Sequence, residues 1–338
     1  MADPDEIKPV ASQLARVSYL FLLGIILLVG ILHLATLLLA ALFAYLALTK
    51  LYILKHRGKW VAVAFFLILV FALAYEMGFF INQVVRTLPV IAEKAIPSVI
   101  QWAEKYHVQL PFSDYNSLKE VAFDAVKSQV NYLGSFAKFA RGATSQFLFL
   151  IVGVVVAIGL FLNPRLELHR ERHLVRNNLY SLCCDQIAQR FTTFYRSFAT
   201  VMGAQIIISA INAGVTAIFV LAVQLPYAAV VIGMTFLCGL LPIIGNLVSN
   251  TIVVGIGFTV SPRMALIAMV FLLVIHKLEY FLNSKIVGDR IRNPLWLTLL
   301  GLVIGERLMG IPGMILAPVV LNYLKLEASA LEVKPPRK

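Results

Sequence analysis

The chain has 338 residues, of which 60% are hydrophobic and 14% are charged, whereas a soluble domain carries about 25% charged residues. This composition excludes an ordinary soluble protein and predicts an all-α polytopic membrane protein. The formal net charge of +12 is typical of basic cytoplasmic loops between membrane-spanning helices, so we expect no nucleic-acid partner.

The first apolar block, residues 17–48, contains no Asp, Glu, Lys or Arg. The apolar core of a cleavable signal peptide has only about 7–15 residues, so we interpret this block as a membrane segment.

Residues 49–59 hold basic but no acidic side chains, which places them in the cytoplasm. With the N-terminus also inside, the block must cross twice and turn near residues 30–33. The alternative is one long tilted helix with the N-terminus outside. Residues 60–82 then cross outward.

Residues 83–145 form the longest predicted piece on the outer side. Within it, residues 118–126 alternate apolar and charged side chains at helical spacing, and Pro89, Pro97 and Pro111 are expected to divide it into about three helices. We interpret it as an amphipathic helical segment on the membrane surface; a binding domain is the alternative.

Residues 147–162 are expected to return to the cytoplasm, and residues 165–196 to form a basic amphipathic helix at the interface. His169 and His173 are spaced to share one helix face, but no carboxylate or cysteine is evident as a further ligand, so we expect a solvated face rather than a metal site. The helix from about residue 197 to residue 223 then exits again.

Two later apolar blocks are interrupted by glycine and proline. Residues 228–261 are broken at residues 239–246, and residues 295–324 at residues 305–313. Each break leaves two half-length arms, which predicts a pair of re-entrant hairpins that enter from opposite sides. Such a pair is the best sequence pointer to a substrate site at the membrane midplane. The alternative is that these residues only kink full-length helices.

Polar side chains near the breaks are expensive to bury in a membrane and therefore indicate function. We expect the amides to hydrogen-bond solute, and a glutamate to bind a cation or proton. Glu306 and Arg307 form either a structural ion pair or part of the pathway. The predicted substrate or ion pathway consists of Gln205, Asn212, Pro242, Gly245, Asn246, Asn250, Glu279, Asn283, Glu306 and Arg307, and the second hairpin tip of Gly310, Pro312 and Gly313.

Four motifs resemble the autoinducer-2 exporter (AI-2E, PerM-like) permease family: GAQ at 203–205, LPIIG at 241–245, EYFLNSKIVG at 279–288 and GIPGMILAP at 310–318. The resemblance implies about eight membrane segments with re-entrant elements, both termini inside, and a homopentamer with elevator-like movement. It also implies autoinducer-2 or similar solutes, or sodium/proton exchange in some members. Asn246, where the family often has proline, and the charged Glu306 and Arg307 depart from the pattern.

We therefore expect a secondary transporter of the bacterial inner membrane that exports a small polar solute, with no cofactor and no enzymatic activity. A sodium/proton antiporter is the alternative, and a non-transporting envelope assembly protein is a third. Five regions are expected: scaffold helices at 1–82, the outer segment at 83–145, a membrane helix with the basic interfacial helix at 146–196, the transport region at 197–326 and a basic cytoplasmic tail at 327–338.

Overall fold

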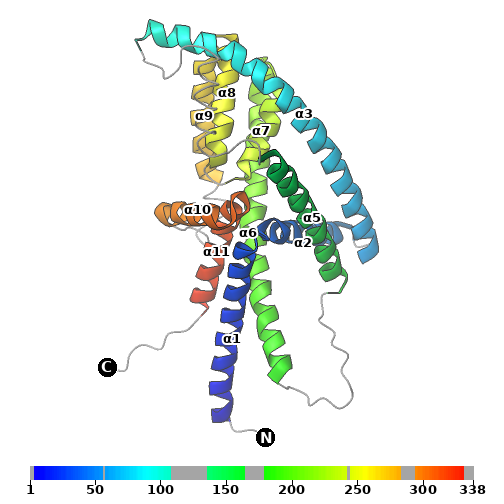
Figure 1. The fold of residues 1–338 in the computed structure, drawn as a ribbon. Coiled ribbons are helices and arrows are strands. Elements are labelled where there is room, and N and C mark those ends of the chain that lie inside the picture. Colours follow the sequence, from blue (N-terminus) through cyan, green and yellow to red (C-terminus); the bar gives the residue numbers. More distant parts are fainter. Residues whose placement is uncertain are drawn as a thin grey trace, which may run out of the picture. The chain divides into compact units, whose positions relative to one another are not determined.

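The structure, a computed structural model, describes residues 4–55, 58–107, 135–163, 179–241, 244–282 and 294–330. Every regular element within these ranges is an α-helix (Figure 1). In order, they are α1 (Pro4–Ile31), α2 (Ala35–Lys55), α3 (Lys59–Lys105), α5 (Ser135–Leu162), α6 (Leu179–Ala222), α7 (Ala228–Gly239), α8 (Ile244–Val260), α9 (Pro262–Leu282), α10 (Leu295–Met309) and α11 (Ile311–Ser329).

Within the described residues, five helices, α2, α3, α5, α6 and α11, are long and apolar enough to cross a membrane. A helix satisfies its own backbone hydrogen bonds, which is what a chain in lipid requires. The protein is therefore an all-α polytopic membrane protein, as its composition predicts.

The helices group into two compact units. The first unit comprises Met1–Phe66, Gln146–Met202 and Ile291–Lys338, and the second comprises Leu67–Ser145 and Gly203–Arg290. Both α3 and α6 contribute residues to each unit.

The core of the first unit is built on one face of α6. Phe194, Phe198 and Met202 recur every four residues and are 4% exposed or less. They pack with residues of α1, α2 and α11, and the ring of Phe43 meets that of Phe198 edge-on at 4.9 Å between centroids. Lipid tails are as apolar as these side chains, so close packing rather than water exclusion holds such helices together.

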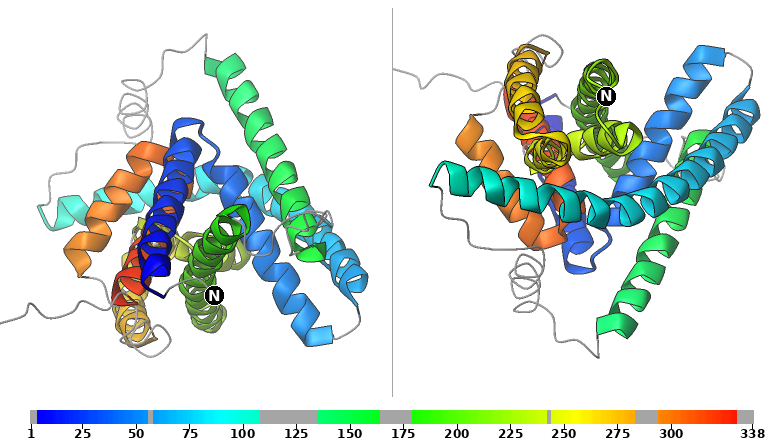
Figure 2. Two further views of the ribbon diagram at one scale, coloured as in Figure 1. Left: turned by 90° about the horizontal axis from the view of Figure 1, so that it is seen from below. Right: turned by 90° about the horizontal axis from the view of Figure 1, so that it is seen from above.

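The second unit contains α7, α8 and α9 with the end of α6 and most of α3. Helices α8 and α9 lie side by side (Figures 1 and 2). Val220, Val253 and Ile256 are at most 1% exposed in its core, and the rings of Phe219 and Phe271 stack with centroids 3.9 Å apart.

The first predicted turn is confirmed. Helix α1 ends at Ile31, the backbone of His33 adopts a positive φ of 54°, and α2 begins at Ala35. A single helix through residues 17–48 is therefore excluded.

The expected boundary between an interfacial helix and a membrane helix near Arg196 is wrong. Helix α6 runs without a break from Leu179 to Ala222, because the buried face made by Phe194, Phe198 and Met202 continues across that position. Arg190 and Arg196, two of the basic residues that suggested an interface, are carried on this helix.

The expected breaks at Pro89 and Pro97 are also wrong, because both lie inside the 47-residue α3. A proline in a helix interior costs about 3 kcal/mol through its lost hydrogen bond and its steric clash. The neighbouring Ile91, Ala95 and Ile96 are each 6% exposed, so packing along this stretch offsets that cost.

The break in the first interrupted block is confirmed, since α7 ends at Gly239 and α8 begins at Ile244. A side chain on Gly245 would overlap the carbonyl of Cys238, so glycine is what lets the start of α8 approach the end of α7. The two helices form a hairpin.

The second break is narrower than predicted. Glu306 and Arg307 lie within α10, and only Gly310, with φ 64° and ψ −149°, separates α10 from α11. Pro312 stands in the first turn of α11, where proline is well tolerated. Gly305 and Gly313 each lie against the other's carbonyl oxygen, so these glycines serve the close contact of α10 with α11 (Figure 2).

Some predictions concern residues outside the described ranges. These are Pro111, the stretch 118–126, His169, His173, Pro242 and Asn283.

Candidate functional site

One face of α6 is polar although the helix around it is apolar. Ser209, Asn212 and Thr216 lie on this face and are 0%, 4% and 1% exposed. Burying a polar side chain without a partner costs free energy, so this stripe needs compensating contacts or a ligand.

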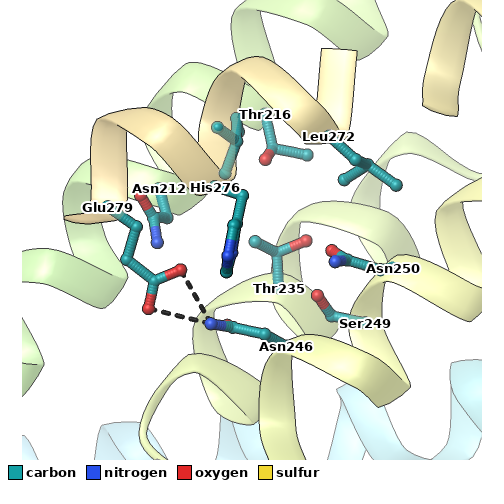
Figure 3. Close-up of a pocket in the computed structure, with 10 residues that line it drawn as sticks. Asn212, Thr216, Thr235, Asn246, Ser249, Asn250, Leu272, His276 and Glu279 are labelled. Atoms are coloured by element: carbon teal, nitrogen blue, oxygen red, sulfur yellow. Dashed lines mark hydrogen bonds between the residues drawn. The ribbon is translucent and has the colours of Figure 1, made fainter. Parts of the chain in front are cut away.

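Helices α7 and α8 supply matching polar groups. Thr235 on α7 and Ser249 on α8 are 8% and 5% exposed. Asn246 and Asn250, one turn apart on α8, line the same cavity with them. Three helices of the second unit, α6, α7 and α8, thus direct hydroxyl and amide groups to one place (Figure 3).

Glu279 on α9 provides the only acidic group among the described side chains that line this cavity. The side-chain amide nitrogen of Asn246 donates to both carboxylate oxygens, at 2.8 and 2.7 Å (Figure 3). The described lining contains no lysine or arginine, and His276 is its remaining titratable side chain. The carboxylate is therefore held by an amide rather than neutralised by a fixed cation.

The cavity is small and incompletely hydrogen-bonded. Its volume is about 10 Å³, close to the lower limit for one water molecule. The amide oxygen of Asn212 and the hydroxyl of Thr235 are buried with no hydrogen-bond partner among the described residues. A carboxylate that has neutral oxygen atoms without partners near it, in a cavity of this volume, is suited to bind a small hard cation or a proton.

Comparison with known proteins shows the family. The profile of the AI-2E family transporter matches residues 17–329. The chain belongs to the AI-2E transporter family. One curated relative is the Bacillus subtilis (strain 168) protein named "Putative transport protein YdbI", which is 29% identical over 142 residues. That similarity covers 41% of this chain and 41% of the relative.

The structure brings four of the predicted pathway residues together in this AI-2E transporter: Asn212, Asn246, Asn250 and Glu279 all line the cavity. Gln205 instead donates its side-chain amide to the carbonyl oxygen of Gly239 at 2.5 Å. That contact satisfies a carbonyl at the end of α7, which has no partner within its own helix.

Gly245 lies at the start of α8 in the second unit, whereas the predicted residues of the second break belong to the first unit. Glu306 and Arg307 form an ion pair at 3.9 Å, with side chains 54% and 85% exposed. An exposed pair of this kind contributes little to stability. Gly310, Pro312 and Gly313 lie at the junction of α10 with α11.

Sequence reasoning missed Thr216 and Thr235. Thr216 follows Asn212 by one helical turn, so the spacing of polar residues along α6 contained the signal. Thr235 is a single hydroxyl in an apolar stretch, and no local pattern distinguishes it from a threonine that bonds its own helix.

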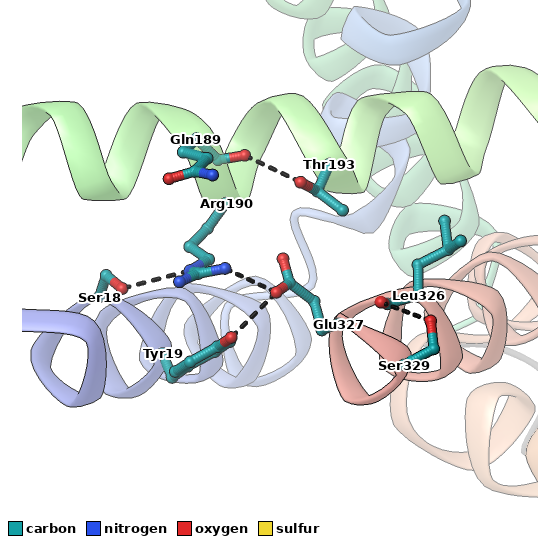
Figure 4. Close-up of polar contacts among 8 residues, drawn as sticks. All are labelled: Ser18, Tyr19, Gln189, Arg190, Thr193, Leu326, Glu327 and Ser329. Carbon is teal, nitrogen blue, oxygen red and sulfur yellow. Dashed lines mark hydrogen bonds and ion pairs between the residues drawn. The ribbon is translucent and has the colours of Figure 1, made fainter. Parts of the chain in front are cut away.

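Sequence reasoning also missed a polar cluster in the first unit. Arg190 on α6 pairs with Glu327 on α11 at 2.6 Å, with side chains 13% and 9% exposed. The hydroxyl of Tyr19 on α1 donates to the same carboxylate oxygen at 2.9 Å, and the guanidinium lies 4.2 Å from the Tyr19 ring centroid (Figure 4). The cluster joins three helices that are far apart in sequence.

Proposed function

We propose that this AI-2E transporter is a secondary transporter in which Glu279 binds the coupling cation or proton, and that it exports a small polar solute. The observation that carries the proposal is the Glu279 cavity, where a carboxylate is held by an amide and faces two hydroxyl or amide oxygens without partners among the described residues. Carboxylates at membrane depth are functional by default.

The size of the cavity bears on what binds there. A volume of about 10 Å³ admits a proton, a bare cation or one water molecule, and excludes a metabolite. The solute would therefore bind in another conformation or beside this cavity. The same proposal includes elevator-like movement of the helical hairpins and their re-entrant insertion into the membrane. It also includes a pentameric assembly and an inner-membrane location with cytoplasmic termini.

A sodium/proton antiporter is the second candidate. The same observation favours it, because the described polar side chains of the cavity, His276 apart, each carry an oxygen atom, and oxygen is the donor that hard cations prefer. In that mechanism the carboxylate binds sodium and a proton in turn, and no organic solute is needed.

The two candidates are separated by transport in proteoliposomes. Autoinducer-2 flux and the response of an internal pH dye to added sodium are measured for wild type, Glu279→Gln and Glu306→Gln. We expect Glu279→Gln to abolish transport, because the amide cannot ionise, while Glu306→Gln retains it. Solute flux supports export, and a sodium-driven pH change without solute supports antiport. Full activity of Glu279→Gln in both assays would remove this cavity from the mechanism. No transport by wild type in either assay would leave envelope assembly as the candidate.

A further inference from the structure

A second and much larger cavity lies beside the polar one in the same unit. Its volume is about 520 Å³, within the range of small-molecule binding sites, about 300–1,000 Å³. Residues of α3, α8 and α9 line it, and most of the described ones are apolar. They include Val99, Leu247, Val254, Phe258, Met269 and Leu273. We refer to this cavity as the apolar groove.

In the described lining of the groove, the polar groups without a local backbone partner gather at one end. Asn250 and His276, together with Leu272, line both the groove and the polar cavity of Glu279. Thr251 also lines the groove, but its hydroxyl donates to the carbonyl of Leu247 at 2.8 Å and is thereby satisfied. The groove therefore has a long apolar wall and a polar end shared with the site of the carboxylate.

The charges around the groove indicate which headgroup a ligand should carry. Among the described residues, no lysine, arginine or acidic residue lines the groove, and Glu279 lies one helical turn from His276 on α9. Its carboxylate faces no fixed cation in the described lining of the polar cavity. An anionic headgroup at the shared end would be repelled, a purely apolar ligand would leave Asn250 and His276 without partners, and a cationic headgroup would be attracted.

We propose that the apolar groove binds a single-chain amphiphilic cation. Its apolar chain lies along Val254, Phe258 and Leu273, and its ammonium group reaches Asn250 and His276 on the side of Glu279. The site goes beyond cation coupling at Glu279, although its preference for positive charge rests on that carboxylate.

Gly255 offers a way to fill the groove. It lines the groove, and a side chain built there would meet no atom within 4 Å. Leucine is a better helix former than glycine, so Gly255→Leu should fold and occupy the space of the ligand. Gly214 on α6 is a matched control, because it is also helical, also has open space around it, and lines neither cavity.

The test is equilibrium binding of radiolabelled decylamine to the full-length protein purified in detergent. Alkylamines titrate near pH 10, so the probe is positively charged at neutral pH. We expect saturable binding to wild type and to Gly214→Leu, and binding roughly tenfold or more weaker to Gly255→Leu, because its side chain must be displaced. Equal affinity of Gly255→Leu and wild type, or no saturable binding to wild type, would overturn the proposal.

Competition tests the headgroup. Unlabelled decylamine should displace the probe best, decanol less well and decanoic acid least. Glu279→Gln should weaken decylamine binding and leave competition by decanol unchanged. Decanoic acid competing as well as decylamine would refute a cationic ligand. These readouts measure binding alone, so they fail or succeed independently of the flux assay for Glu279.

Discussion

At the scale of single residues, the two ion pairs of the first unit differ in burial. Arg190 and Glu327 are 13% and 9% exposed, whereas Glu306 and Arg307 are 54% and 85% exposed. Removing one member of a buried pair leaves an uncompensated charge and costs about 3–5 kcal/mol. An exposed pair is worth about 0–1 kcal/mol. The buried pair should therefore dominate the electrostatic contribution to the stability of this unit.

We expect Glu327→Ala to lower the free energy of unfolding in detergent by about 3–5 kcal/mol, and Glu306→Ala by less than about 1 kcal/mol. Thermal unfolding followed by circular dichroism checks both. The double variant Arg190→Met, Glu327→Leu should recover much of the loss, because it removes both charges together. Equal destabilisation by the two single alanine variants would contradict a special role for the buried pair.

A substitution of Thr235 is expected to change function without lowering stability. Its buried hydroxyl has no partner among the described residues, so Thr235→Val removes an unsatisfied group at nearly constant volume. We expect unfolding stability to be unchanged or to rise by about 1 kcal/mol. The apparent KM for the coupling cation should rise, since one oxygen of the proposed site is lost. An unchanged KM would show that this hydroxyl does not contact the cation.

At the scale of elements, the α10–α11 contact depends on two glycines. A Cβ on Gly313 would overlap the carbonyl oxygen of Gly305, so the helices must separate to accept it. Gly313→Ala should destabilise the protein by about 1–3 kcal/mol, whereas Gly159→Ala, with open space around it on α5, should be neutral or slightly stabilising. Thermal unfolding of both variants is the measurement, and equal midpoints would refute the close contact.

The sequence predicted the positions where helices end more accurately than the positions where helices continue. Glycine and proline mark the ends of α7 and α10 because the signal there is local. At Pro89 the same local signal predicted a break that the structure does not have. Packing of Ile91 and its neighbours within the second unit outweighs one lost hydrogen bond. Such packing depends on residues distant in sequence and cannot be read from the local pattern.

The candidate site was partly predictable for a similar reason. Asn246 and Glu279 stand out as polar residues in apolar helices, so their presence at membrane depth was expected. Their direct hydrogen bond joins residues 33 positions apart and required the structure. Gln205 shows the converse. Its polar side chain in an apolar helix suggested solute binding, but that side chain donates a hydrogen bond to the backbone carbonyl of Gly239.

At the scale of the whole molecule, the break after Ile31 bears on topology. It gives the first apolar block two helices, α1 and α2, and two crossings would place the N-terminus and residues 49–59 on the same side. The basic residues of that loop predict that this side is the cytoplasm. Helix α3, which begins at Lys59, would then lead outward to its end at Lys105.

This topology predicts which positions a membrane-impermeant maleimide can reach in intact spheroplasts. In a background where Cys183, Cys184 and Cys238 are replaced by serine, Arg16→Cys and Lys50→Cys should be protected until the membrane is permeabilised. His107→Cys, exposed just after the end of α3, should be labelled without permeabilisation. Labelling of Arg16→Cys from outside would show that α1 and α2 do not cross as a pair. Protection of all three would place the end of α3 inside, and the outer position of residues 83–145 would have to be abandoned.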